Sequence, residues 1–114
     1  MDATGIDAVS CRVTRETNAV ESATAHDATP TAKIKLVHLL ARISQTASVV
    51  RVAAGEPEQT KRMPRLIARL EAQIGKASAL IAHQHQRQRI SDALANVLLQ
   101  NAQEALSLCM LLKP

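Results

Sequence analysis

Residues 90–112 read ISDALANVLLQNAQEALSLCMLL and form the most apolar segment of this 114-residue chain. The segment contains no glycine and no proline, and its aliphatic residues fall on nearly every side of a helix. A helix that is apolar all round is normally buried on more than one side. What covers this segment therefore decides the fold.

The composition of the chain favours helices over strands. Hydrophobic residues make up 46% of the sequence, yet it contains no Phe, Tyr or Trp. Strands are enriched in aromatic and β-branched residues, and sheets need many turn residues, whereas only three glycines and four prolines are present. The sequence therefore predicts an all-α protein, either a three-helix up-down-up bundle or a long helical hairpin.

Residues 1–29 look like a tail that precedes this helical domain. They are rich in Ser and Thr, and they hold five acidic and two basic residues. Only Ile6, Val9 and Val13 share one helical face, and isolated helices shorter than about 12–15 residues are marginal. The sequence predicts a flexible, disordered acidic tail over 1–29, followed by a helical domain over 30–114.

The first clear helix is predicted over residues 30–54. Thr29 can cap a helix whose first position is Pro30, and Gly55 is typical of the residue that follows a helix. Between them, apolar residues recur at alternating spacings of four and three. This stripe comprises Leu36, Leu40, Ile43, Ala47, Val50 and Ala54.

A second helix is predicted over residues 60–82 and a third over 90–112. The second helix has the same alternating spacing, and its start near Thr60 places Pro64 in the first turn, where proline is tolerated. Its stripe comprises Met63, Ile67, Leu70, Ile74, Ala77 and Ile81.

The polar run HQHQRQR at residues 83–89 leaves two topologies open. The nearly equal lengths of the three segments favour a turn here and a bundle. The run contains no Gly or Pro, and Gln and Arg are good helix formers, which favours one long helix that pairs with a second copy.

Two narrow stripes do not enclose a helix that is apolar all round. We therefore expect a homodimer or a different protein to cover part of segment 90–112, because helices with such surfaces dock on one another. The residues expected at this interface are Leu94, Leu98, Leu99, Leu106, Met110 and Leu111.

A basic patch is expected on the second helix. Arg62, Arg65, Arg69 and Lys76 lie at i, i+3, i+7 and i+14, so they share one side. Residues 30–114 hold twelve basic and five acidic residues, a net charge of +7. Such a face can bind phosphates, although the chain has no aromatic residue on which bases could stack.

Enzymatic chemistry has little support in the sequence. It contains no phosphate-binding loop, no GxSxG and no HExxH motif, and His83 and His85 would point to opposite sides of a helix. We expect no catalytic residues, no metal site and no cofactor. The longest apolar run, Leu108–Leu112, is far shorter than the roughly 20 residues of a membrane span.

The expected function is a non-enzymatic protein–protein interaction module that acts through the apolar C-terminal helix. Adaptors, chaperones, antiactivators and assembly or secretion-system subunits belong to this class. The alternative is a nucleic-acid-associated regulator that uses the basic patch. No signal peptide is visible, so the expected location is cytoplasmic, and export without a classical signal peptide stays open.

Overall fold

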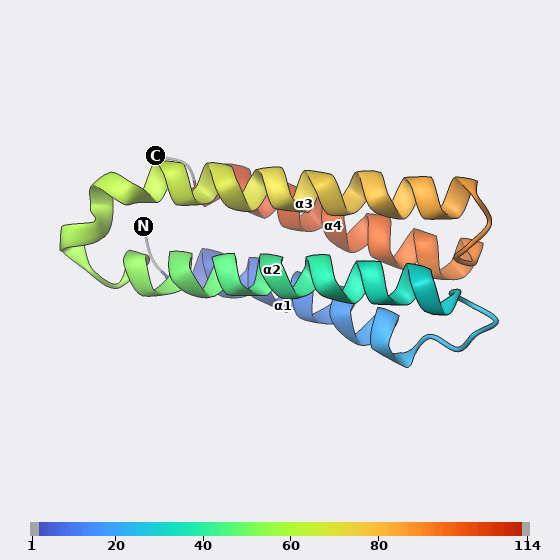
Figure 1. The fold of residues 1–114 in the computed structure, drawn as a ribbon. Helices are drawn as coiled ribbons and strands as arrows, with labels where there is room; N and C mark the ends of the chain where they lie inside the picture. The colour runs from blue at the N-terminus through green and yellow to red at the C-terminus, as the bar shows by residue number, and fades with distance from the viewer. Residues whose placement is uncertain (1–2, 113–114) are drawn as a thin grey trace.

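The computed structural model describes residues 3–112, which form four packed helices. These are α1 (Ala3–Ser22), α2 (Pro30–Ala54), α3 (Met63–Gln86) and α4 (Asp92–Leu112), and a 3₁₀ helix, η1 (Pro57–Arg62), connects α2 to α3. The helices run alternately up and down in a bundle of 47 × 18 × 18 Å (Figure 1). The predicted all-α class is confirmed, and no helix in this range is long and apolar enough to cross a membrane.

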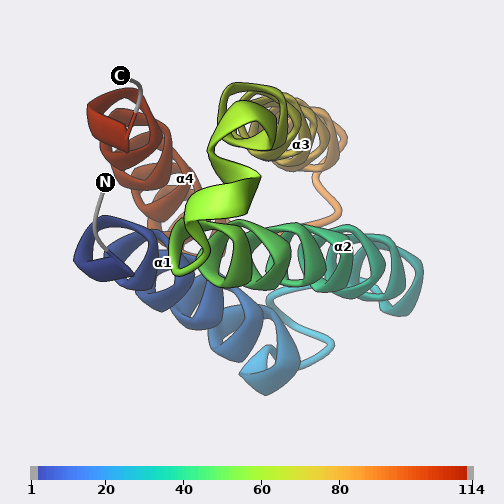
Figure 2. The same cartoon turned by 90° about the vertical axis from the view of Figure 1, so that its left-hand side faces the viewer.

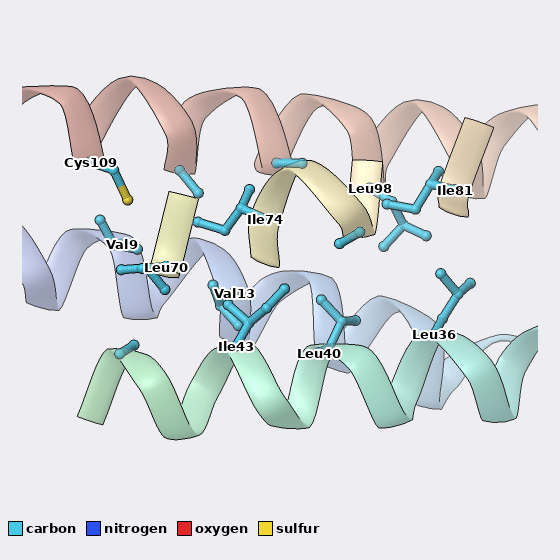
Figure 3. Close-up of a cluster of buried hydrophobic side chains, with 14 of the residues drawn as sticks. Val9, Val13, Leu36, Leu40, Ile43, Leu70, Ile74, Ile81, Leu98 and Cys109 are labelled. Carbon is cyan, nitrogen blue, oxygen red and sulfur yellow. The ribbon is translucent and has the colours of Figure 1, made fainter. Parts of the chain in front are cut away.

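The four helices occupy the corners of a square when viewed along the bundle (Figure 2). Each helix packs on its two neighbours, in the pairs α1–α2, α2–α3, α3–α4 and α4–α1. Aliphatic side chains from all four helices meet in one interior (Figure 3). Cys109 lies in this interior and is fully buried, which is the usual environment of a thiol that acts as a small hydrophobe.

The expected flexible tail is wrong, because Ala3–Ser22 form α1. Its buried face consists of Ile6, Val9, Val13, Glu16 and Val20, at spacings of three and four. The marginal stability of short isolated helices does not apply here, since α1 packs against both α2 and α4. The first helix therefore covers part of α4, which was expected to need a second chain.

Two ion pairs join α1 to its neighbours. The Nε atom of Arg12 lies 2.9 Å from Glu104 Oε2 on α4, and Arg51 Nη2 on α2 lies 2.9 Å from Asp7 Oδ1. All four side chains are partly solvent-exposed. Such pairs typically contribute about 0–1 kcal/mol each, so most of the stabilisation of α1 comes from its buried aliphatic face.

The two loops at one end of the bundle are bonded to each other. Thr29 N–H donates to the carbonyl of Arg89 at 2.9 Å, and Ser91 N–H donates to the carbonyl of Asp27 at 2.7 Å. Thr29 also caps α2, as the sequence predicts, because its hydroxyl accepts from Ala32 N–H at 3.3 Å. These bonds fix the α1–α2 pair of helices against the α3–α4 pair.

The three helices predicted over 30–112 correspond to α2, α3 and α4. The bounds of α2 agree with the prediction, and Gly55 follows its last residue. Helix α3 begins at Met63 rather than near Thr60, because η1 occupies the preceding residues, and Pro64 lies in its first turn. Helix α4 begins at Asp92, where the hydroxyl of Ser91 accepts from Leu94 N–H at 3.1 Å.

The polar run at 83–89 ends one helix and forms a turn. Helix α3 ends at Gln86, and Gln88 has a φ of 59°, so the chain reverses and α4 packs antiparallel to α3. The alternative of one continuous helix through this run is wrong. A residue with a positive φ can stop a helix without glycine, which explains why the turn has no Gly or Pro.

Replacing Gln88 with glycine is expected to raise the free energy of unfolding by about 0.5–1 kcal/mol. The left-handed conformation is unfavourable for a residue with a Cβ atom and is readily adopted by glycine. Urea unfolding followed by circular dichroism at 222 nm measures this change. The matched control is Gln86→Gly in the last turn of α3, which is expected to lower stability instead. A loss of stability in both variants would contradict the prediction.

Candidate functional site

Shallow hollows with exposed aliphatic residues lie along the boundary between α2 and α3. Three hollows follow one another there, and neighbouring hollows share a residue: Val49 belongs to the first and second, and Arg42 to the second and third. The first hollow also reaches Arg62, the last residue of η1, and the third reaches Ile34 and Leu80. Together they form one surface that we call the α2–α3 groove. Its lining residues are Ile34, Lys35, His38, Leu39, Arg42, Gln45, Thr46, Ser48, Val49, Val52, Ala53, Glu56, Gln59, Arg62, Leu66, Arg69, Gln73 and Leu80.

Three aliphatic side chains of α2 stay exposed along this groove. Ile34 is 68% exposed, Val49 is 46% exposed and Val52 is 62% exposed. They do not belong to the stripe that enters the core, and they lie on a second stripe at positions 34, 38, 42, 45, 49 and 52. Helix α2 therefore has an inner apolar face for the bundle and an outer, partly apolar face toward solvent.

The groove is lined by four cationic side chains and one carboxylate. Arg42 of α2 and Arg69 of α3 both line the middle hollow, so positive charge reaches it from both helices. Lys35 and Arg62 line the two outer hollows. Glu56, at the η1 end, is the acidic residue of this lining.

Two of the four residues of the predicted basic patch line this groove. All four of its side chains are exposed, and Arg62 and Arg69 line the groove directly. Arg62 Nη1 donates to Gln59 Oε1 at 3.0 Å, which orients the guanidinium at the η1 end. Arg65 and Lys76 are exposed on α3.

The residues predicted at an interface on α4 differ in their exposure: some lie in the core of the bundle and others are exposed. Leu94 and Leu98 are buried inside the bundle, at 7% and 0% exposure, so a partner cannot reach them while it is intact. Leu99 and Leu106 are partly buried and pack against the same core. Met110 and Leu111, at 65% and 81% exposure, remain accessible near the end of α4.

A buried carboxyl group, which the sequence did not single out, lies on the inner face of α1. Glu16 is 2% exposed, and its Oε1 atom has no hydrogen-bond partner. Burial raises the pKa of this carboxyl from 4.5 to about 8, because a low-dielectric environment disfavours the charged form. The group is therefore mainly protonated at pH 7. It belongs to the core rather than to the groove.

Neither histidine of the polar run lines the groove, although the third hollow reaches Leu80 on the same helix. His85 is partly buried and its Nε2 pairs with Asp92 Oδ1 at the start of α4, while His83 is exposed. Among the described residues, no group of three or more His, Cys, Asp or Glu side chains is arranged to hold a metal ion.

Comparisons of the chain with protein-family models, curated proteins and solved structures found no match. The function therefore has to be inferred from the residues and their geometry.

Proposed function

We propose that this protein is a non-enzymatic helical interaction module that binds a different protein along the α2–α3 groove. Adaptors, chaperones, antiactivators and assembly or secretion-system subunits work in this way. The observation that carries the proposal is the exposure of Ile34, Val49 and Val52 along one groove. Burying a fully exposed side chain of this kind contributes about 1.5–3 kcal/mol. These three are about half to two-thirds exposed, so roughly that share of the free energy is available to a partner.

The proposal moves the main contact surface from α4 to α2. Helix α4 was expected to use its apolar surface for a partner, but α1 covers much of it. Val97, Met110 and Leu111 of α4 are also exposed, and none of the three lines the groove. The groove is preferred because it combines apolar contacts with charge, which is the usual composition of a specific interface.

The charge distribution supports binding rather than catalysis. His38 and Glu56 line different hollows, at opposite ends of the groove, so they do not form a paired acid and base. General acid–base catalysis needs such groups within hydrogen-bond reach of one reacting atom.

Site-specific photo-crosslinking tests the proposal in the cells that make this protein. A photoreactive residue at position 52 is expected to crosslink to a distinct cellular protein, because Val52 is exposed beside the groove. The control position is Arg15, which is exposed on α1. The proposal fails if position 52 captures nothing, or if both positions capture the same set of proteins.

A second candidate function is a nucleic-acid-associated regulator. It is favoured by the exposure of Arg62 at the end of η1 and of Arg65, Arg69 and Lys76 on α3. Binding of duplex DNA at low salt should then weaken by at least about tenfold when Arg62, Arg65 and Arg69 are replaced with alanine, because phosphate contacts dominate such affinity. Absent binding, or binding unchanged by the triple replacement, would exclude this candidate.

A further inference from the structure

The dimensions of the α2–α3 groove suit one helix of a partner. Its α2 side runs from Ile34 to Val52, which at 1.5 Å per residue is about 27 Å. A partner helix of roughly 18 residues has the same length. Ile34 lies at one end of the groove, and Val49 and Val52 lie at the other end. Apolar contacts with a partner helix would therefore extend over several turns.

The charges of the groove specify the chemistry of that helix. Arg42 of α2 and Arg69 of α3 line the middle hollow from its two sides. Lys35 and Arg62 line the hollows at the two ends of the groove. A helix with an apolar stripe flanked by Asp and Glu would match both the aliphatic residues and these cations. Electrostatic complementarity of this kind sets specificity and speeds association.

The same charges disfavour two other occupants. In a symmetric dimer through this groove, each copy presents the same patch, so Arg42 and Arg69 would face an equally basic surface. A nucleic acid would satisfy the cations, but its phosphates would leave Val49 and Val52 without apolar contacts. An acidic, amphipathic protein segment uses both properties of the surface.

We propose that the α2–α3 groove binds an acidic amphipathic helix of about five turns that belongs to another protein. Its apolar stripe lies over Ile34, Val49 and Val52, and its carboxylates lie against Arg42 and Arg69. This inference rests on the proposed function, because it names the segment that such a partner contributes.

A peptide-display selection tests this proposal. The full chain is the target, and the probe is a library of random 18-residue peptides on a helix-favouring scaffold. Enriched peptides are expected to combine aliphatic residues at alternating spacings of three and four with an excess of Asp and Glu. Their affinity is expected to fall as salt rises, because ions screen the charge attraction. Failure to enrich any peptide, or enrichment without excess acid, overturns the proposal.

Matched variants then locate the binding site. The double replacement Arg42→Glu and Arg69→Glu is expected to weaken the enriched peptides by at least about tenfold, since it reverses the charge on both sides of the middle hollow. The control, Arg15→Glu with Arg87→Glu, changes the net charge by the same amount at exposed sites on α1 and the α3–α4 turn. It is expected to change the peptide affinity by less than about twofold, because salt screens exposed charges that lie far from the bound peptide. Equal losses in both variants overturn the proposal.

A second pair of variants tests the apolar part of the site. Val49→Ser with Val52→Ser is expected to weaken peptide binding by at least about tenfold, because two aliphatic contacts are lost. Met110→Ser with Leu111→Ser removes exposed apolar area elsewhere and is expected to leave the affinity unchanged. The opposite result would place the peptide on α4 and overturn the proposal. If position 52 still crosslinks to a cellular protein, the interaction function stands and only the acidic helix is excluded.

Discussion

Replacing Glu16 with glutamine is expected to raise the free energy of unfolding by about 5 kcal/mol at pH 9. The carboxyl is buried, and its pKa is raised from 4.5 to about 8. Each unit of that shift corresponds to about 1.4 kcal/mol of difference between the folded and unfolded states. Small domains are stable by only about 5–15 kcal/mol, so this single group has a large share of the total.

Whether stability rises or falls with pH depends on whether the folded or the unfolded chain keeps the proton of Glu16. In the unfolded chain the carboxyl ionises near pH 4.5, whereas in the bundle it ionises near pH 8. Between these values the folded state holds a proton that the unfolded state has lost. The contribution of Glu16 to the free energy of unfolding is therefore fully present below about pH 4.5 and is lost as the pH rises to about 8.

Urea unfolding across pH 4–9, followed by circular dichroism at 222 nm, measures this dependence. The chain has no Trp or Tyr, so intrinsic fluorescence cannot report it. Glutamine has nearly the same shape as the protonated carboxyl but does not ionise, so the variant is expected to lose the fall in stability between pH 4.5 and 8. The control is Glu58→Gln, at an exposed residue of η1, with an expected change within about 0.5 kcal/mol. A parallel pH profile for wild type and Glu16→Gln would contradict the prediction.

Glu16 also explains why the sequence did not predict α1. The buried face of α1 has the same alternating spacing as the stripes of α2 and α3, at positions 6, 9, 13, 16 and 20. The fourth position holds an acidic residue, which interrupts the apolar pattern. Charged residues are almost never fully buried unless paired, so composition alone favours a solvated tail.

The other helices were predictable because their local patterns agree with the tertiary packing. Thr29-Pro30 and Gly55 bound α2 in both the sequence and the structure. The polar run at 83–89 was ambiguous because its turn depends on a left-handed Gln88, and no residue-type preference identifies that conformation. The start of α3 shifted by three residues because η1 uses the residues before it.

The candidate site was only partly predictable. The spacing predicts that Arg62, Arg65, Arg69 and Lys76 share one side of a helix. All four are exposed, but Arg62 belongs to η1 rather than to α3. The groove itself needs Arg42 and the exposed aliphatic residues of α2, and their position depends on which side of α2 faces α3. Amphipathic spacing identifies the inner face of a helix, but a second, outer face is visible only after the helices are packed.

Truncating Leu98 and Leu111 to alanine is expected to give opposite results, although both lie on α4 and both were predicted at an interface. Leu98 is fully buried and belongs to the cluster of hydrophobic side chains in the core (Figure 3). Leu98→Ala is expected to lower the free energy of unfolding by about 2–5 kcal/mol, because it removes buried methyl groups and leaves a cavity. Leu111 is 81% exposed, and Leu111→Ala is expected to change stability by less than about 0.5 kcal/mol.

Urea unfolding at pH 6 measures both variants, and analytical ultracentrifugation of each reports its association. If α4 packs on α1 of the same chain, the urea midpoints of wild type and of Leu98→Ala each stay the same at every protein concentration. If α4 were covered by a second copy, both midpoints would rise with protein concentration, because the folded state of a dimer is linked to association. Concentration-dependent midpoints would contradict the four-helix packing and return the main interface to α4.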